Sequence, residues 1–145
     1  MTELKYEHFK KVCQAVGLKI TNQRYIVLKI LVESAEHPTA DRLLLLATNS
    51  LPGLGRDTVY RTLNTLIERG LVRKLVMPGG ATHFDGNITP HHHFLCEACG
   101  KIFDLSWPAF ENLPLPREAS QMGQINSVSV LVRGVCRYCR ENTAH

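Results

Sequence analysis

Residues 91–100 read HHHFLCEACG and bring two kinds of metal ligand into one short stretch. Cys96 and Cys99 form a C-x-x-C step, and Cys136 and Cys139 repeat that step near the C-terminus. A C-x-x-C turn lets both sulfurs reach one ion, and two such pairs are a usual ligand set for tetrahedral zinc. We therefore expect a closed, structural Zn²⁺ site that pins the ends of a small sheet together.

The histidines ahead of this turn indicate a second, chemically different metal site. Successive side chains of a strand point to opposite faces, so His91 and His93 project together. Two carboxylates and a further histidine can reach such a pair. The expected ligands are His37, Asp85, His91, His93 and Asp104. This mixed nitrogen and oxygen set suits iron, manganese, zinc or nickel, and the rival interpretation is five unrelated polar residues.

The composition is that of an ordinary globular protein. The chain has 145 residues, 44% hydrophobic and 21% charged, and no apolar run reaches the ~18 residues that a membrane span needs. The segment MTELKYEHFKKVC has acidic residues and no continuous apolar stretch, so we expect no signal peptide and a cytoplasmic protein. In that compartment C-x-x-C pairs bind metal more often than they form disulfides. A net charge of +4 permits an acidic partner without requiring one.

The first half of the chain predicts four helices and a hairpin. Helical periodicity covers residues 4–16, 21–34, 39–50 and 56–69. Thr21 and Thr39 are good N-caps for the second and third of these helices. Two short β-prone runs, residues 71–76 and 81–84, flank the turn-rich loop MPGG. Short helices followed by a hairpin are typical of a winged helix-turn-helix, whose last helix enters the major groove of DNA.

The outer face of the fourth helix carries side chains that suit phosphates and base edges. They are Arg56, Thr58, Tyr60, Arg61 and Asn64. Arg73 and Lys74 on the hairpin can also reach phosphates. An exposed polar helix face is otherwise only solvated, so the pattern alone leaves both interpretations open.

The second half predicts a small α/β domain. Strands are expected over residues 91–96, 101–105 and 125–133. Pro108, Pro114 and Pro116 interrupt the segment between the last two, so any helix there is short or broken. The fold class is therefore α+β. We expect a winged-helix DNA-binding domain over residues 1–85, a linker over residues 86–90 and a metal-binding domain over residues 91–145.

Five motifs together resemble the Fur superfamily of bacterial metal-dependent repressors. They are TNQR at residues 21–24, HPTAD at 37–41, DTVYRTL at 57–63, HHHFLCEACGK at 91–101 and CRYC at 136–139. The resemblance implies a homodimer, held by the C-terminal α/β dimerisation domain, that binds operator DNA through positions matching Tyr60 and Arg61. It assigns the four paired cysteines to structural Zn²⁺ and the second ligand set to a regulatory Fe²⁺ or Mn²⁺. It implies no membrane and no organic ligand as partner.

Within that superfamily the residue at position 104 separates branches, because iron sensors usually carry Glu there and peroxide sensors carry Asp. Asp104 thus implies a repressor that senses hydrogen peroxide. In that branch, peroxide reacts at Fe²⁺, a ligating histidine (His37 or His91) becomes 2-oxo-histidine, and the repressor leaves its operator. With manganese bound by the same ligands, the resemblance implies a repressor that is insensitive to peroxide. The alternative is an iron- or zinc-responsive repressor of the same fold without peroxide sensing.

Two features depart from the superfamily pattern. Residues 125–134 lack the histidines that many members carry there, which argues against a further metal site. Pro114 and Pro116 fall where relatives usually form a helix, which predicts an altered or shortened helix in the dimerisation domain.

Two enzyme classes fit parts of the sequence. A non-haem iron oxygenase uses two histidines and a carboxylate, but this chain has no series of strands to enclose a substrate. A thiol oxidoreductase uses a C-x-x-C pair, but zinc would occupy both pairs and remove their nucleophiles. We therefore expect no enzyme activity.

Overall fold

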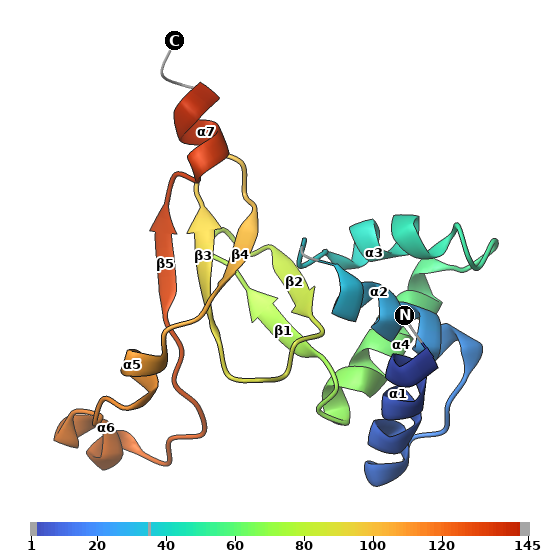
Figure 1. The fold of residues 1–145 in the computed structure, drawn as a ribbon, viewed down its shortest axis with the longest axis horizontal. Helices are drawn as coiled ribbons and strands as arrows, with labels where there is room; N and C mark the ends of the chain where they lie inside the picture. Colours follow the sequence, from blue (N-terminus) through green and yellow to red (C-terminus); the bar gives the residue numbers. More distant parts are fainter. Residues whose placement is uncertain (1–2, 35, 143–145) are drawn as a thin grey trace. The chain divides into compact units, whose positions relative to one another are not determined.

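The structure of the protein is a computed structural model that describes residues 3–34 and 36–142 (Figure 1). The outermost residues of the two expected domains, residues 1–2 and 143–145, lie outside the described residues, as does residue 35. The chain divides into two compact units, one ending at Ile88 and one beginning at Thr89.

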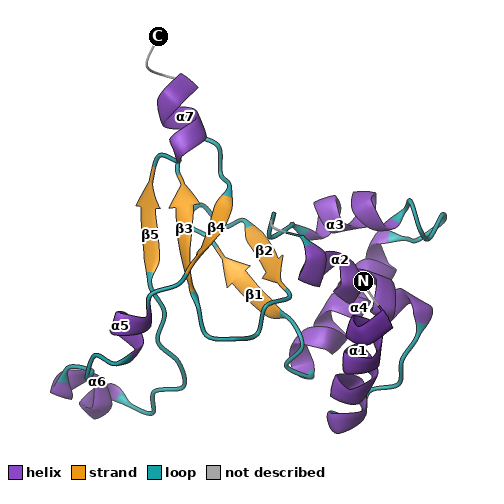
Figure 2. Ribbon diagram, viewed as in Figure 1, coloured by secondary structure: helices purple, strands orange, loops and turns teal. Residues whose placement is uncertain are grey.

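The described part of the first unit contains four helices followed by a two-stranded hairpin (Figure 2). Its elements are α1 (Glu3–Ala15), α2 (Asn22–Glu33), α3 (Ala40–Ala47), α4 (Arg56–Glu68), β1 (Arg73–Val76) and β2 (Thr82–Asp85). This order of helices and hairpin confirms the expected winged helix-turn-helix. α3 is shorter than expected, because the chain turns over residues 48–50.

Threonine hydroxyls begin α2 and α3. Thr21 Oγ1 accepts a hydrogen bond from the Arg24 backbone N–H at 3.2 Å, and Thr39 Oγ1 accepts one from the Arg42 backbone N–H at 3.3 Å. Both threonines have an extended backbone, which is the geometry of N-cap residues. The two predicted N-caps are therefore confirmed.

The apolar faces of α2, α3 and α4 form the core of the first unit. Its fully buried side chains include Val27, Leu43, Val59, Leu63 and Leu66. Phe84 of β2 joins this core, and its backbone N–H donates to the Pro38 carbonyl oxygen at 3.0 Å. The hairpin is thereby attached to the loop that precedes α3.

The second unit is built on a three-stranded mixed sheet in the order β4-β3-β5 (Figure 2). Its elements are β3 (His92–Cys96), β4 (Ile102–Leu105), α5 (Pro108–Glu111), α6 (Arg117–Met122), β5 (Leu131–Gly134) and α7 (Arg137–Asn142). β3 pairs antiparallel with β4 and parallel with β5. The α+β fold class is confirmed.

The segment between β4 and β5 agrees with the sequence-based prediction for its helices and differs from it for the strand. Its helices α5 and α6 are short, as the prolines predict. The strand expected over residues 125–133 is wrong in its first part, since β5 begins only at Leu131. Its partner β3 begins at His92 and pairs His93 with Leu131, so Val128, 46% exposed, has no partner strand in the described chain.

The helix α7 was not expected from the sequence. It begins directly after Cys136 and carries Cys139. Among the described residues, none of the helices combines the length and the apolarity that crossing a membrane requires.

Gly86 follows the hairpin and lies against the backbone of α2. A Cβ at this position would come within 2.9 Å of the Leu31 carbonyl carbon and of the Val32 nitrogen. Because both atoms belong to a helix backbone, they cannot move aside easily. We expect Gly86→Ala to lower the free energy of unfolding by about 2 kcal/mol through overpacking, as measured by urea denaturation followed by circular dichroism.

Gly55→Ala is the matched control for this substitution. Nothing lies within 4 Å of a Cβ built there, and the φ angle of Gly55 is −92°. Its expected loss is about 0.5 kcal/mol or less, the effect of replacing a glycine N-cap. Equal losses in the two variants would contradict the close packing of Gly86 on α2.

Candidate functional site

Four cysteine sulfurs meet at one end of the sheet in the second unit. Cys96 ends β3, Cys99 lies in the following turn, Cys136 follows β5, and Cys139 lies in α7. All four Sγ atoms lie within 4.8 Å of one another, and those of Cys99 and Cys136 are 3.9 Å apart. Sulfurs bound to one tetrahedral Zn²⁺ at about 2.3 Å would be roughly 3.8 Å apart. The cluster is therefore consistent with a structural zinc site.

Hydrogen bonds within the cluster shift the pKa values of two of these thiols in opposite directions. Cys96 Sγ accepts backbone N–H groups from Cys136 at 3.3 Å and from Cys99 at 3.4 Å, and these bonds lower the pKa of Cys96 to about 6. Hydrogen bonds with the thiols of Cys136 and Cys99 raise the pKa of Cys139 to about 12. Without a metal, the raised pKa of Cys139 therefore keeps that thiol protonated near neutral pH. A dication supplies the compensating charge, so its binding releases protons.

Backbone contacts hold the two C-x-x-C turns next to each other. The Glu97 backbone N–H donates to the Gly134 carbonyl oxygen at 2.7 Å, and Arg133 Nε donates to Glu97 Oε1 at 2.9 Å. Gly100, at a φ of 77°, donates its N–H to the Cys96 carbonyl oxygen at 2.9 Å. A side chain is disfavoured in that left-handed conformation, which explains a glycine directly after Cys99.

His37 and Asp85 form a buried pair in the first unit. His37 Nε2 lies 3.5 Å from Asp85 Oδ2, and each side chain is 5% exposed. His83 Nδ1 lies 2.7 Å from the His37 carbonyl oxygen, and the Asn87 backbone N–H donates to Asp85 Oδ1 at 2.9 Å. A buried imidazole nitrogen beside a carboxylate oxygen has the chemistry of half a metal site.

His37 has an unusual backbone conformation. Its φ is +50°, the one positive φ among the non-glycine residues of the described chain. This left-handed conformation costs a non-glycine residue on the order of 1–2 kcal/mol. The contacts of His83 with the His37 carbonyl and of Phe84 with the Pro38 carbonyl hold the backbone there. Strain maintained by surrounding contacts is typical of functional positions.

Asp104 lies beside two imidazoles in the second unit. The register of β3 and β4 pairs His93 with Asp104. Asp104 Oδ1 lies 3.3 Å from His91 Nε2 and 3.6 Å from His93 Nε2. His91 Nδ1 lies 2.6 Å from the Thr89 carbonyl oxygen, which places its N–H on Nδ1 and makes Nε2 the nitrogen that can coordinate a metal.

His92 points away from this group, as strand alternation predicts. It is 2% exposed, its ring centroid lies 5.0 Å from that of Phe110, and its Nδ1 accepts the Val130 backbone N–H at 3.0 Å. His92 thus connects α5 with the chain leading into β5, which is a packing role.

The polar face of α4 is exposed and carries two arginines. The side chains expected to contact DNA all belong to it: Arg56, Thr58, Tyr60, Arg61 and Asn64. Thr58 is half-buried and the other four are exposed. Arg56 Nη2 lies 2.9 Å from Asp41 Oδ1, with both side chains 65% exposed. Solvent makes such a surface ion pair weak, so the guanidinium can exchange Asp41 for a phosphate.

Tyr60 and Asn64 border a hollow between α4, the first turn of α3 and the hairpin. Thr39, Lys74 and Thr82 also line it, together with Asp41, whose carboxylate pairs with Arg56. Hydroxyls, an amide and an ammonium group around one concave surface can donate hydrogen bonds to phosphate or base-edge oxygens. The face therefore extends from α4 onto the hairpin.

Sequence reasoning missed the residues that orient the candidate ligands. Thr89 contacts His91 through its backbone carbonyl. Any residue could supply that carbonyl, so the sequence does not reveal the contact. His83 contacts the backbone of His37, forty-six residues away in the chain. That partnership requires knowing how the hairpin packs beside α3, and no local pattern contains it.

Comparisons of the sequence and of the structure with known proteins agree with one another. The sequence profile of the Ferric uptake regulator family matches residues 15–132. The Peroxide operon regulator of Bacillus subtilis (strain 168) is 32% identical over 129 residues, which cover 89% of each chain. The Peroxide-responsive repressor PerR of Staphylococcus epidermidis is 30% identical over 125 residues, covering 86% of this chain and 83% of that protein. The structure of the Campylobacter jejuni peroxide stress regulator has a TM-score of 0.67 at 32% identity, covering 96% of this chain and 100% of that one.

We expect Cys139→Ser to lose bound zinc and to unfold the second unit. Structural zinc contributes on the order of 10 kcal/mol to the folding of small domains, and serine is a poor replacement for a thiolate ligand. The measurements are zinc content per chain and circular dichroism with and without a chelator. Cys13→Ala is the control, since Cys13 is buried in the core of the first unit and should leave the zinc content unchanged. A chelated wild-type protein that keeps its full helix and strand content would contradict the structural role.

Proposed function

The chain belongs to the ferric uptake regulator family, and on this premise we propose that it is a metal-dependent transcriptional repressor that releases operator DNA on contact with hydrogen peroxide. The family makes it a transcription regulator, not an enzyme. Relatives that match most of the chain at 30–32% identity are named for their response to peroxide.

The observation that carries the proposal is the pair of half-sites. In each unit an imidazole Nε2 lies beside a carboxylate oxygen, at 3.5 Å in the first and at 3.3 and 3.6 Å in the second. Ligand atoms about 2.1 Å from one ion lie roughly 3 Å apart, so these separations suit a cation. Both half-sites bind the same regulatory Fe²⁺ or Mn²⁺. The ligands are His37, Asp85, His91, His93 and Asp104.

An ion shared by the two units couples metal binding to DNA binding. The ion binds most tightly to the arrangement in which all its ligands reach it, and so it shifts the population toward that arrangement. In a homodimer this sets the separation of the two α4 helices, which must match two half-sites about 34 Å apart or a multiple of that spacing. Metal occupancy therefore favours operator binding.

Dimerisation uses the second unit. Large apolar side chains between α5 and β5 are exposed by 41–86%: Leu113, Leu115, Met122, Ile125 and Val128. Exposed apolar surface of this kind marks protein interfaces, and a two-fold dimer buries the same surface on both chains.

Peroxide sensing uses the histidine ligands themselves. Iron, when bound, supplies the redox chemistry. In the net reaction one oxygen of H₂O₂ replaces a ring C–H hydrogen of His37 or His91, giving 2-oxo-histidine, and the other oxygen leaves as water. The two side chains are only 5% and 7% exposed, so a reaction at the metal reaches them more readily than oxidants in bulk solvent do. An oxidised ligand binds the ion less well, and the repressor leaves DNA.

The decisive experiment compares iron-loaded and manganese-loaded protein on a duplex selected from a randomised pool. We expect H₂O₂ to release the iron protein and to leave the manganese protein bound, because Mn²⁺ does not support the redox step. Fluorescence anisotropy measures release, and mass spectrometry of the peptides containing His37 and His91 measures the added oxygen.

His8 provides the internal control, because it is exposed on α1 and far in sequence from the ligands. Equal oxidation of His8 and the ligand histidines would indicate bulk oxidation. Release of neither form by peroxide would instead support an iron- or zinc-responsive repressor.

Asp104→Asn tests the regulatory site without changing the size of the side chain. Loss of the carboxylate charge should weaken Mn²⁺ binding by more than about tenfold and remove the metal dependence of operator affinity. Calorimetric titration with Mn²⁺ and anisotropy measure the two effects. Glu7→Gln removes a carboxylate from the exposed face of α1 and should change neither quantity. Unaltered Mn²⁺ affinity in Asp104→Asn would exclude this residue as a ligand.

A further inference from the structure

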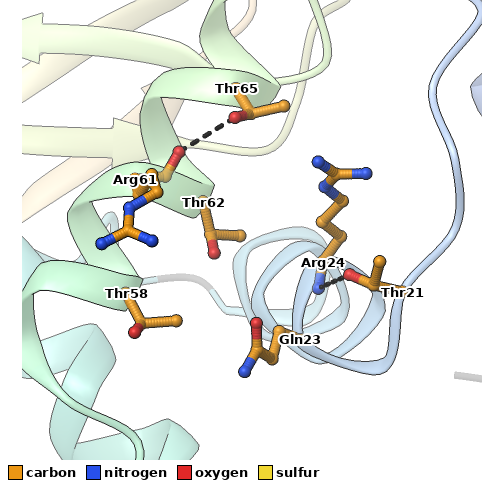
Figure 3. A pocket seen from close by; sticks show the side chains of 7 residues that line it. All are labelled: Thr21, Gln23, Arg24, Thr58, Arg61, Thr62 and Thr65. Carbon is orange, nitrogen blue, oxygen red and sulfur yellow. Dashed lines mark hydrogen bonds between the residues drawn. The ribbon is translucent and has the colours of Figure 1, made fainter.

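A pocket of about 150 Å³ lies between α4 and the first turn of α2 (Figure 3). Its lining residues are Thr21, Gln23, Arg24, Thr58, Arg61, Thr62 and Thr65. Figure 3 shows the α4 side chains and the α2 side chains on opposite sides of it. The lining contains two guanidinium groups, four hydroxyls and an amide, and it contains no carboxylate. The chemistry of this pocket suits an anion.

The first turn of α2 adds backbone donors to the pocket. This helix has twelve residues, and the hydroxyl of its N-cap Thr21 accepts the Arg24 N–H. The N–H groups of Asn22 and Gln23 come earlier in the turn and have no acceptor within the helix. Together with the positive end of the helix dipole, they favour an anion at this end.

Thr62 provides the independent sign of a ligand. It is 7% exposed and lines the pocket, yet among the described residues its hydroxyl makes no hydrogen bond. The hydroxyl of Thr65, one turn later, donates to the Arg61 carbonyl oxygen at 3.0 Å. The side chain is therefore largely buried while its hydroxyl opens onto the pocket, where it can donate to an acceptor that arrives from outside the chain.

Arg24 and Arg61 keep donors for such an acceptor. Arg24 Nη1 donates to the Lys19 carbonyl oxygen at 2.6 Å, which uses one of the five N–H groups of the guanidinium and orients the rest. Arg61 is exposed and reaches the pocket from the α4 side. A tetrahedral anion with several acceptor oxygens is the ligand that satisfies guanidinium, hydroxyl and backbone donors together.

We propose that this pocket binds a backbone phosphate of the operator, beside the groove that α4 enters. The inference rests on the proposed repressor function and extends the DNA contact from α4 to the first turn of α2. Phosphate contacts fix the register of a protein on DNA, whereas base contacts provide specificity. The pocket thus sets the depth and angle at which Tyr60 and Asn64, on the other flank of α4, meet the bases.

Thr62→Val is the sharpest test, because valine has nearly the same shape and the lost hydroxyl has no partner within the described chain. The variant should fold with an unchanged or higher melting temperature, and it should bind the selected duplex roughly tenfold more weakly in the manganese-loaded protein. Thr48→Val is the matched control. Thr48 lies at the end of α3, outside the pocket, with its hydroxyl donated to the Leu45 carbonyl oxygen, so operator affinity should not change.

A second measurement identifies the group that Thr62 contacts. Duplexes carrying one neutral methylphosphonate in place of a phosphate are scanned along each strand. At one position per half-site, the methylphosphonate should weaken binding of the wild-type protein. At that same position it should not weaken binding of Thr62→Val further, because the variant already lacks the contact. Arg24→Gln should also lower the slope of log affinity against log salt by about one per pocket, while Arg117→Gln on α6 should not.

The outcomes separate this inference from the proposed function. If the affinity losses from Thr62→Val and from the methylphosphonate add at every position, the phosphate pocket is overturned and the repressor function stays intact. Competition by millimolar inorganic phosphate without coupling to any backbone position would assign the pocket to a free anion and also overturn the inference. If the wild-type protein selects no duplex at all, both the function and the pocket fail.

Discussion

Groups that could bind a metal lie at both ends of β3, and a bound cation would offset the repulsion between their charged forms. His93 and Cys96 lie three residues apart on that strand, so it connects the histidine half-site with the cysteine cluster. The C-x-x-C turn at Cys96 and Cys99 joins β3 to β4, whose register pairs His93 with Asp104. Zinc bound by Cys96 and Cys136 likewise supports the parallel pairing with β5. A structural ion at the cysteines would therefore also stabilise the strand pairing that brings His93 beside Asp104.

In the first unit the corresponding ligands are attached to elements that support α4. His37 stands just before α3, and Asp85 ends β2. Leu43 of α3, Phe84 of β2 and Leu63 of α4 belong to one buried cluster. The left-handed backbone of His37 and its contact with His83 give the imidazole a fixed direction. A cation that moves this pair consequently acts on the same core that positions the exposed face of α4.

Features with local signals were predictable from the sequence, and features that depend on distant partners were not. Helix periodicity, the caps Thr21 and Thr39, and the C-x-x-C steps act over a few residues, and the helices, hairpin and cysteine cluster follow from them. The start of β5 depends on where β3 begins. The positive φ of His37 depends on a hairpin residue far along the chain. The hydroxyl of Thr62 becomes part of a pocket only when α2 packs against α4.

Under the proposed function, the length of the carboxylate at position 104 would bear on whether the ion responds to peroxide. With an aspartate, Oδ1 lies near both His91 Nε2 and His93 Nε2, at 3.3 and 3.6 Å. A glutamate is longer by one methylene, about 1.5 Å, and its carboxylate could approach a shared ion with both oxygens. In the proposed sensor, a second carboxylate oxygen on the ion would compete with peroxide for it. A short carboxylate, 47% exposed beside two buried imidazoles, would leave such an ion accessible to a small solvent-borne oxidant.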